Sequence, residues 1–235
     1  MRKDKSFPSE FPESEPPNMS HENTPLLTKF PSLQKISQSK ECNKRKVIFC
    51  EGDKGEFIYY LISGVMVSYK VTASGQLRIL QFFLPESFIG NITLFNELEY
   101  NMTLEAFEIC RYLKFNKRQL KQLVLEEPRI LMSMYQDLST KLTLTSEIII
   151  NNFLTVEERI IKSLLLLCQN CGLRTEEGIL INLNLTQDEL ARLAGTTRVT
   201  VTKLLSDLSK QGILRTKPKP WIIFKIEKLL YFLNN

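Results

Sequence analysis

The sequence contains a single histidine in 235 residues, His21, and it lies in the proline-rich N-terminal segment. Metal-dependent catalysis on a β-rich scaffold needs clustered histidine and carboxylate ligands, and a haem sensor normally needs an axial histidine. The sequence also lacks a G-x-x-x-x-G-K-S/T phosphate loop and a G-x-S-x-G nucleophile motif. We therefore expect no enzymatic activity and no bound metal or cofactor.

Long hydrophobic runs are missing as well. The longest apolar run, Ile160–Cys168, is broken by Lys162 and Ser163 and is far shorter than the roughly 18 to 20 residues of a membrane-spanning helix. Residues 1–24 are charged and proline-rich, without the apolar segment of a signal peptide, and we expect a disordered arm. The five cysteines are odd in number and scattered, unlike a disulfide framework. These absences predict a cytoplasmic protein with reduced thiols and no membrane partner.

A chain of 235 residues with 43% hydrophobic side chains is long enough for two modest domains, each with its own core. Its formal net charge of +5 is mild, but the charge is unevenly distributed. Between Leu190 and Lys228 there are nine basic side chains and two acidic ones. The cationic character is therefore concentrated in the C-terminal part of the chain.

Short runs rich in Val, Ile, Phe and Tyr dominate residues 47–115, and turn-forming sequences such as EGDKG at 51–55 and ASGQ at 73–76 separate them. Several short strands at this spacing predict a β sandwich or roll. Because the connections are too short for helical crossovers, the strands should pair antiparallel.

Two helical patterns follow these strands. Asn116 and Gln119 have the capping-box spacing of a short helix, which Pro128 interrupts. Pro128 suits the first turn of a second helix, which we expect to run to Phe153. Along it an apolar seam, with a gap at Thr145, is formed by Leu131, Tyr135, Leu138, Leu142 and Ile149. The seam predicts pairing with a second copy of the helix in a homodimer, and packing on the β roll alone is the alternative.

The C-terminal third contains two helical patterns joined by a tight turn. Thr186 and Glu189 form a capping box for the first helix, and Gly195 supplies the turn. Thr197 can cap the second helix, and Gly212 can end it. Every boundary of a helix-turn-helix therefore has its expected residue.

The second of these helices has an apolar face and a face without acidic residues. Since successive residues are about 100° apart, one buried arc contains Val201, Leu204, Leu205 and Leu208. A hairpin with a basic tip follows over residues 213–224. We expect the non-acidic face and this tip to bind DNA through Thr197, Arg198, Val199, Thr202, Lys203, Ser206, Lys217 and Lys219.

An ordinary amphipathic helix with a solvated polar face is the alternative to this interpretation. Such a face usually mixes Glu with Lys, and it would not place the β-branched Val199 at its centre. A valine there favours apolar contact with a thymine methyl, which predicts an AT-rich operator core. Arg198 remains able to bind guanine or phosphate.

At these residues the sequence resembles the CRP/FNR family of bacterial regulators, over roughly residues 25–235. Gly52, Gly64 and Gly90 match the family's β-roll glycines, and ESFIGNITLF at 86–95 is similar to its effector-pocket loop. The resemblance implies a transcription regulator that binds a palindromic operator in double-stranded DNA as a homodimer and alters the recruitment or access of RNA polymerase. It also implies a small-molecule effector between the β roll and the long helix.

We therefore predict an α+β protein of four parts. They are a disordered arm (1–24), an antiparallel β roll of the cyclic-nucleotide-binding type (25–127), a dimerisation helix (128–153) and a winged helix-turn-helix domain (154–235). An effector would act by binding the DNA-competent arrangement more tightly than the idle one. The expected moving element is the junction around residues 151–155.

The predicted effector site departs from the members that bind cyclic nucleotides. Those members hold the phosphate with an Arg-Ser pair and the ribose with a Glu, and the matching residues here are Asn101, Met102 and Asn91. The full predicted set is Phe88, Ile89, Gly90, Asn91, Asn101, Met102, Thr103, Thr145 and Ser146. Because it contains no basic residue, cyclic AMP should bind poorly, and a small, largely apolar or aromatic molecule fits better.

Two alternatives remain for the sensor. Family members that sense chlorinated aromatic acids are similar in pocket type, but Lys141 would have to reach inward to meet a carboxylate here. The other alternative is that these side chains fill a core, and that the regulator responds to redox state or to a protein partner instead.

The cysteines give no strong signal. The spacing of Cys42, Cys50 and Cys110 fits the iron–sulfur members of the family poorly. Cys168 and Cys171 form a C-x-x-C motif inside an apolar helical run, where core packing is the expectation. A reversible disulfide or a metal clip is the alternative for this pair.

Overall fold

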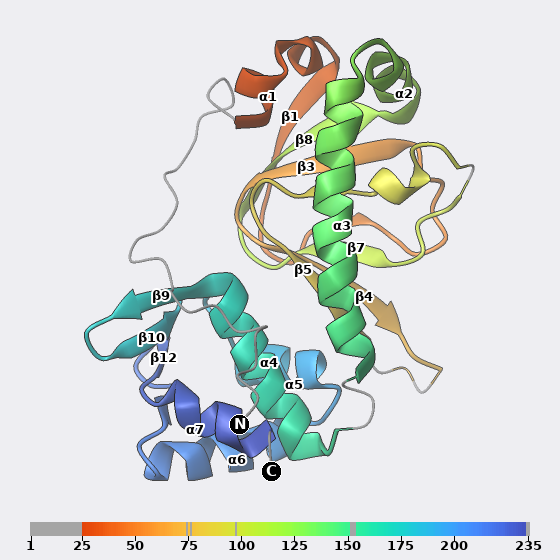
Figure 1. Cartoon of the computed structure of the whole chain (residues 1–235). Coiled ribbons are helices and arrows are strands. Elements are labelled where there is room, and N and C mark those ends of the chain that lie inside the picture. Colours follow the sequence, from red (N-terminus) through yellow and green to blue (C-terminus); the bar gives the residue numbers. More distant parts are fainter. Residues whose placement is uncertain (1–24, 74, 76, 97, 151–153, 234–235) are drawn as a thin grey trace. The chain divides into compact units, whose positions relative to one another are not determined.

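The computed structural model describes residues 25–233 except 74, 76, 97 and 151–153 (Figure 1), and the predicted arm, residues 1–24, lies outside this range. The chain forms two compact units, of which one contains Asn18–Lys70 and Ile79–Ile150 and the other contains Asn151–Asn235. In the described part of the chain, no helix has both the length and the apolar character needed to cross a membrane.

The β roll consists of two four-stranded sheets. One has the strand order β1-β8-β3-β6 and the other β2-β7-β4-β5. The strands are β1 (Ser37–Cys42), β2 (Val47–Phe49), β3 (Phe57–Ser63), β4 (Met66–Val71), β5 (Leu77–Phe83), β6 (Phe88–Ile89), β7 (Thr103–Ala106) and β8 (Cys110–Asn116). The antiparallel pairing expected from the short connections is confirmed for β1–β8, β3–β8, β3–β6, β2–β7 and β4–β7.

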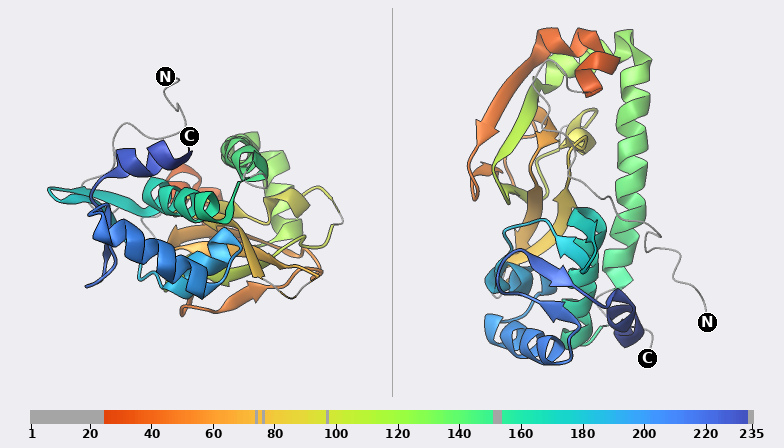
Figure 2. Two further views of the ribbon diagram at one scale, coloured as in Figure 1. Left: turned by 90° about the horizontal axis from the view of Figure 1, so that it is seen from below. Right: turned by 90° about the vertical axis from the view of Figure 1, so that its left-hand side faces the viewer.

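Helices lie along one side and at one end of the roll (Figure 2). They are α1 (Pro25–Lys29), the 3-10 helices η1 (Pro31–Ile36) and η2 (Asn91–Thr93), α2 (Lys117–Glu126) and α3 (Pro128–Ile150). Asn116 caps α2 as predicted, since its side chain accepts hydrogen bonds from the backbone N–H groups of Arg118 and Gln119. Pro128 begins α3 as predicted. The described helix ends at Ile150, and the last three residues of the predicted helix lie outside the described range.

One face of β3 packs against the helices. Ile58, Tyr60 and Ile62 alternate along the strand and point to this side, because successive side chains of a strand point to opposite faces. They lie in one buried cluster with Ile130 and Met134 of α3. The long helix is therefore held to the roll by its N-terminal half.

The other face of β3 packs against the second sheet. Tyr59 and Leu61 lie in a separate cluster with Phe49 of β2 and Leu104 of β7. Burial of both faces explains why the sequence of β3, FIYYLIS, is almost continuously apolar rather than alternating.

An ion pair within α3 also bonds to the backbone of β6. Lys141 Nζ lies 2.5 Å from Asp137 Oδ2, and the two side chains are only 12% and 16% exposed. Both groups bond to the same residue, because Lys141 donates to the Phe88 carbonyl and Asp137 accepts from the Phe88 N–H. Burial raises the pKa of Asp137 and lowers that of Lys141, and the attraction between the two charges opposes both shifts.

The second unit is a winged helix-turn-helix. Its elements are α4 (Val156–Cys171), β9 (Gly172–Thr175), β10 (Gly178–Ile181), α5 (Gln187–Ala194), α6 (Arg198–Lys210), β11 (Leu214–Arg215), β12 (Trp221–Ile223) and α7 (Ile226–Leu233). The four strands form one antiparallel sheet in the order β11-β12-β10-β9. The hairpin β11–β12 was expected from the sequence, whereas β9, β10 and α7 were not.

The C-x-x-C motif lies at the end of α4. Cys168 is fully buried, and burial raises the pKa of its thiol to about 12. Cys171 is partly exposed, and no disulfide joins the two residues. These observations agree with core packing for Cys168.

Two of the roll glycines have similar backbone conformations and different surroundings. Gly52 and Gly64 have φ values of +87° and +84°, in the region that side chains disfavour. A Cβ on Gly64 would lie 2.2 Å from the Ile109 carbonyl oxygen, whereas a Cβ on Gly52 would have no atom within 4 Å. Comparing alanine substitutions at Gly52 and Gly64 therefore separates the free-energy cost of the left-handed conformation from that of a steric clash.

We predict that Gly52→Ala lowers the free energy of unfolding by about 1 to 2 kcal/mol, the cost of a left-handed conformation. Gly64→Ala should lower it by roughly 3 kcal/mol or more, because β3–β4 must also move away from Ile109. Urea titration of the two variants measures both values. Equal losses would contradict the close backbone approach at Gly64.

Candidate DNA-binding interface and effector site

Three capping residues, Thr186, Gly195 and Thr197, determine where the two helices of the helix-turn-helix begin and end. The role predicted for each of them is confirmed. The Thr186 side chain accepts from the Glu189 N–H, and the Glu189 carboxylate accepts from the Thr186 N–H in return. Gly195 follows α5 in the left-handed conformation, with φ 61° and ψ 48°. Thr197 caps α6 by accepting from the Thr200 N–H at 3.3 Å. The geometry that presents α6 is therefore specified locally.

The C-terminal end of α6 is also closed by backbone bonds. The Gly212 N–H donates to the Ser209 carbonyl, and the Ile213 N–H donates to the Leu208 carbonyl, both at 3.0 Å. With Gly212 at φ 63°, these two bonds form a Schellman motif. The prediction that Gly212 ends this helix is confirmed.

The two faces of α6 differ as the sequence predicts. Val201, Leu205 and Leu208 are buried, and Leu204 is half-buried. The residues expected to bind DNA from this helix and its cap are all exposed; they are Thr197, Arg198, Val199, Thr202, Lys203 and Ser206. Val199 is 79% exposed, which is unusual for a valine.

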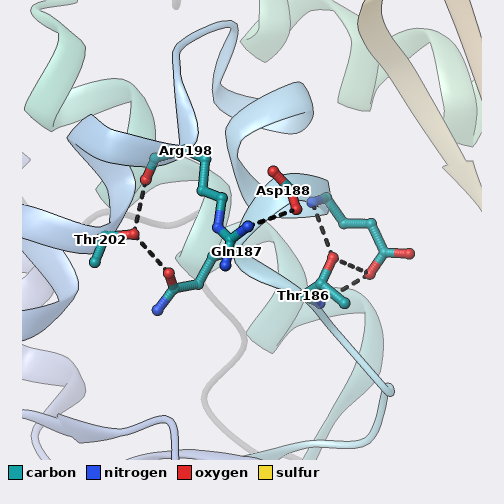
Figure 3. A network of polar contacts seen from close by, with 6 residues as sticks. Thr186, Gln187, Asp188, Arg198 and Thr202 are labelled. Atoms are coloured by element: carbon teal, nitrogen blue, oxygen red, sulfur yellow. Dashed lines mark hydrogen bonds and ion pairs between the residues drawn. The ribbon is translucent and has the colours of Figure 1, made fainter.

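Two contacts from α5 reach this exposed face (Figure 3). Asp188 Oδ2 lies 3.7 Å from Arg198 Nη1, and Gln187 Oε1 accepts a hydrogen bond of 2.6 Å from the Thr202 hydroxyl. Neither Gln187 nor Asp188 was predicted to belong to the DNA-binding surface. The start of α5 therefore adds two polar side chains to it.

The hydroxyl of Thr202 has a second acceptor inside the protein. It lies 2.9 Å from the Arg198 carbonyl, in addition to Gln187. A hydroxyl has one hydrogen to donate, so these two acceptors share it. Thr202 thus offers DNA its methyl group and an acceptor oxygen in this conformation.

The tip of the β11–β12 hairpin presents two lysines. Lys217 and Lys219 are both exposed, and Lys219 Nζ donates to Asn184 Oδ1 at 2.5 Å. At the base of the hairpin, Arg215 lies 3.5 Å from Glu177 in the β9–β10 turn. Arg215 and Lys219 therefore connect the wing to other parts of the domain, and both tip lysines remain exposed.

Arg159 of α4 joins the start of the unit to the helix-turn-helix. Its guanidinium donates to the carbonyls of Ala194 and Gly195 at the end of α5, at 3.0 and 3.4 Å. It also donates to the Leu154 carbonyl at 3.1 Å. One cation thus satisfies carbonyl groups that the end of α5 leaves without helical partners.

The predicted seam of α3 is largely exposed. Tyr135, Leu138 and Leu142 are 63%, 39% and 71% exposed. Leu131 is half-buried and packs against the core of the roll. The side chain of Ile149 lies outside the described part of the chain, and Met132, at 58% exposed, adds an apolar side chain that the spacing did not indicate.

The described residues of the predicted effector site differ in exposure and in the cluster that they join. Phe88 and Ile89 are buried in the two different clusters of the roll, and Gly90 is also buried. Asn101 is exposed, and Asn91 and Met102 are half-buried. Phe88 and Ile89 join different clusters because they are neighbours in β6, and their side chains point to opposite faces.

The three remaining residues of the predicted effector site are Thr103, Thr145 and Ser146. The Thr103 hydroxyl accepts from the Glu51 N–H at 3.0 Å and so stabilises a loop of the roll. The side chains of Thr145 and Ser146 lie outside the described part of the chain. The predicted set contains no basic residue, but the side chain of Lys141 points inward, as the alternative of an acidic effector requires, and donates to the Phe88 carbonyl.

A pocket of about 670 Å³ on the roll contains none of the predicted effector residues. It is lined by Lys54, Gly55, Glu56, Leu98, Glu99, Asn116, Lys117, Arg118 and Lys121. The described residues also contain no group of three or more His, Cys, Asp or Glu side chains placed to hold a metal ion.

The sequence contains a signal for some of the functional residues that were not predicted, and none for their contacts across helices. Gln187 and Asp188 follow the cap Thr186, so their exposure at the start of α5 was predictable. Their contact with α6 was not, because it depends on the angle between two helices. The inward position of Lys141 has a signal, since Asp137 precedes it by four residues on the same helix face.

Comparisons with known proteins agree with both parts of this description. The chain matches the model of the cyclic nucleotide-binding domain over residues 39–127. It matches the model of the Crp-like helix-turn-helix domain over residues 158–232.

Relatives of similar length align with most of the chain. The global nitrogen regulator of Nostoc sp. is 29% identical over 186 residues, 77% of this chain and 83% of that protein. The CRP-like cAMP-activated global transcriptional regulator of Mycobacterium tuberculosis is 26% identical over 199 residues, 84% of this chain and 89% of that protein.

A solved structure extends the similarity to the fold. The c-di-GMP responsive global regulator CLP of Xanthomonas campestris has a TM-score of 0.73 and 25% identity, covering 84% of this chain and 98% of that one. All three of these proteins are named as regulators. With a β roll, a long helix and a winged helix-turn-helix in this order, the chain belongs to the CRP/FNR family of DNA-binding transcription regulators.

Proposed function

We propose that the protein is a homodimeric regulator that binds a palindromic operator and alters the recruitment or access of RNA polymerase in response to a small molecule. The observation that carries the DNA-binding part is the exposed face of α6 and its cap, whose six predicted residues include Arg198 and Lys203 and no acid. Arg198 and Val199 are its base-contacting residues, and the other exposed residues of this face position the helix.

The dimer rests on the apolar face of α3. Tyr135, Leu138 and Leu142 expose large apolar areas on one side of one helix, and a second copy of that helix would bury them. Residues 128–153 then form the dimerisation helix, with the roll at 25–127 before it and the DNA-binding domain at 154–235 after it. If two copies of α3 pair in this way, the two copies of α6 would contact successive half-sites of the operator.

The effector is a small molecule with an apolar body and one anionic group. Relatives respond to cAMP and to c-di-GMP, so the ligand differs between related proteins. In this chain Lys141 supplies the cation, and it lies between α3 and β6, where Phe83 and Phe88 are its neighbours. A ligand carboxylate would compete with Asp137 for Lys141. Binding would shift the population of DNA-competent molecules through the junction at 151–155.

The wing lysines should contribute phosphate contacts. Replacing Lys217 and Lys219 by Ala is expected to weaken binding to every duplex by a similar factor and to reduce the slope of log K against log salt by about 4, because each subunit of the proposed dimer loses two lysines. The control is Lys35→Ala with Lys40→Ala, which removes the same charge from exposed positions of the roll. Fluorescence anisotropy over a salt series measures the slopes. An unchanged slope for the wing variant would refute the assignment.

The seam should hold the dimer together. Leu138→Arg places a charge in the apolar interface, so we expect monomers and loss of operator binding. Leu125→Arg is the matched control, because Leu125 is 66% exposed on α2 and outside the seam. Analytical ultracentrifugation distinguishes the species. In the parent dimer, half-sites should lie roughly 10 to 10.5 base pairs apart. A Leu138→Arg variant that stays dimeric would contradict the seam.

Lys141 and Asp137 should have opposite effects on the effector. A chlorinated phenylacetic acid is expected to bind the parent protein, to bind Asp137→Asn more tightly because the competing carboxylate is gone, and not to bind Lys141→Met. Isothermal titration calorimetry measures all three, with cyclic AMP as the comparison ligand. Micromolar binding of cyclic AMP that Asn101→Ala abolishes would overturn this pocket chemistry.

A further inference from the structure

The surface expected to meet DNA includes one carboxylate. Asp188, in the first turn of α5, lies 3.7 Å from Arg198 Nη1, and the two side chains are 58% and 67% exposed. An exposed ion pair of this kind contributes little to folding stability. The reason for an acid at this position therefore has to be sought in something other than the fold.

Capping does not explain Asp188 either. The start of α5 is already closed by Thr186 and Glu189, which exchange hydrogen bonds in both directions. An acid in the first turn gains a little from the helix dipole, but Glu189 supplies that charge too. Close to DNA phosphates, a second carboxylate opposes binding. Outside its own helix, Asp188 pairs with the guanidinium at the start of α6 (Figure 3).

We propose that Asp188 is a positioning residue that determines sequence specificity by orienting Arg198. A guanidinium has five N–H donors in one plane, and a carboxylate at one Nη holds that plane while leaving the other donors available. An arginine held in this way can present two parallel N–H groups to the O6 and N7 atoms of guanine. An arginine without this partner is free to turn toward the nearest phosphate, where it adds affinity and no sequence information.

DNA strengthens the effect. In the free protein both groups are hydrated, so their attraction is weak. When the helix enters the major groove, water leaves the surroundings of Arg198, and the same attraction acts in a lower dielectric. The orientation imposed by Asp188 is therefore strongest in the complex, where it affects base selection.

This inference rests on the proposed role of Arg198 as a base-contacting residue, and the experiment keeps the two apart. The full-length protein first selects a preferred duplex from a random pool. Each G·C pair of that duplex is then replaced by A·T, and dissociation constants are measured at one salt concentration for Arg198→Ala, Asp188→Asn, the double variant and the parent. The control is Glu227→Gln, which removes one exposed carboxylate from α7 of the same domain.

At one G·C pair in each half-site the parent should discriminate by about 5- to 150-fold, the range of a bidentate arginine–guanine contact. Arg198→Ala should abolish this discrimination. Asp188→Asn should reduce it at least fivefold at the same pair and tighten binding to the replaced duplex, while the double variant matches Arg198→Ala. Glu227→Gln should leave the ratio unchanged.

The two ways of failing look different. If Arg198→Ala keeps the discrimination, the proposed base contact of Arg198 is wrong. If Arg198→Ala abolishes it but Asp188→Asn leaves the ratio intact, the positioning role of Asp188 is overturned. That role is also overturned if Asp188→Asn tightens binding to both duplexes equally, because the carboxylate would then act by charge alone. Equal thermal unfolding midpoints of Asp188→Asn and the parent establish that folding is unaffected.

Discussion

The angle between α5 and α6 is the constraint on which the DNA-binding surface depends. Gly195 sets it by adopting a left-handed conformation that costs other residues energy, and Arg159 maintains it by donating to the carbonyls at the end of α5. With that angle fixed, Arg198 comes within reach of Asp188, and Thr202 within reach of Gln187. A change in the turn would separate all four side chains without altering either helix.

How much of this was predictable depends on whether a feature is local. The caps Thr186, Thr197 and Gly212 are properties of a few consecutive residues, and all three are where the sequence places them. The edge strand β1 escaped prediction because SQSKEC is polar throughout, and it exists by pairing with β8 along its whole length. Its strand character comes from a partner about 70 residues further along the chain, and no pattern within β1 indicates it.

The effector site illustrates the same limit in a different form. A resemblance to the family placed Phe88 and Ile89 side by side in one pocket, but neighbours in a strand face opposite ways, so one joins each core. Conversely, the sequence indicated only that Lys141 would have to reach inward to meet a carboxylate, and it did not place the side chain there. Its position follows from Asp137, whose carboxylate offsets the cost of burying the ammonium, and from the backbone of Phe88, which bonds to both.

The positions of these residues suggest how helix α3 could take part both in effector binding and in the dimer contact. On α3, Asp137 and Lys141 face the roll, whereas Leu138 and Leu142 directly follow them in sequence and lie about 100° further around the helix. A ligand that draws Lys141 away from Asp137 acts on a helix whose adjacent face is apolar and exposed. Any rotation that improves the ligand contact also turns the apolar face. In the proposed regulator, coupling between effector and dimer would need no chain of intermediates, because a single helix would belong to both proposed sites.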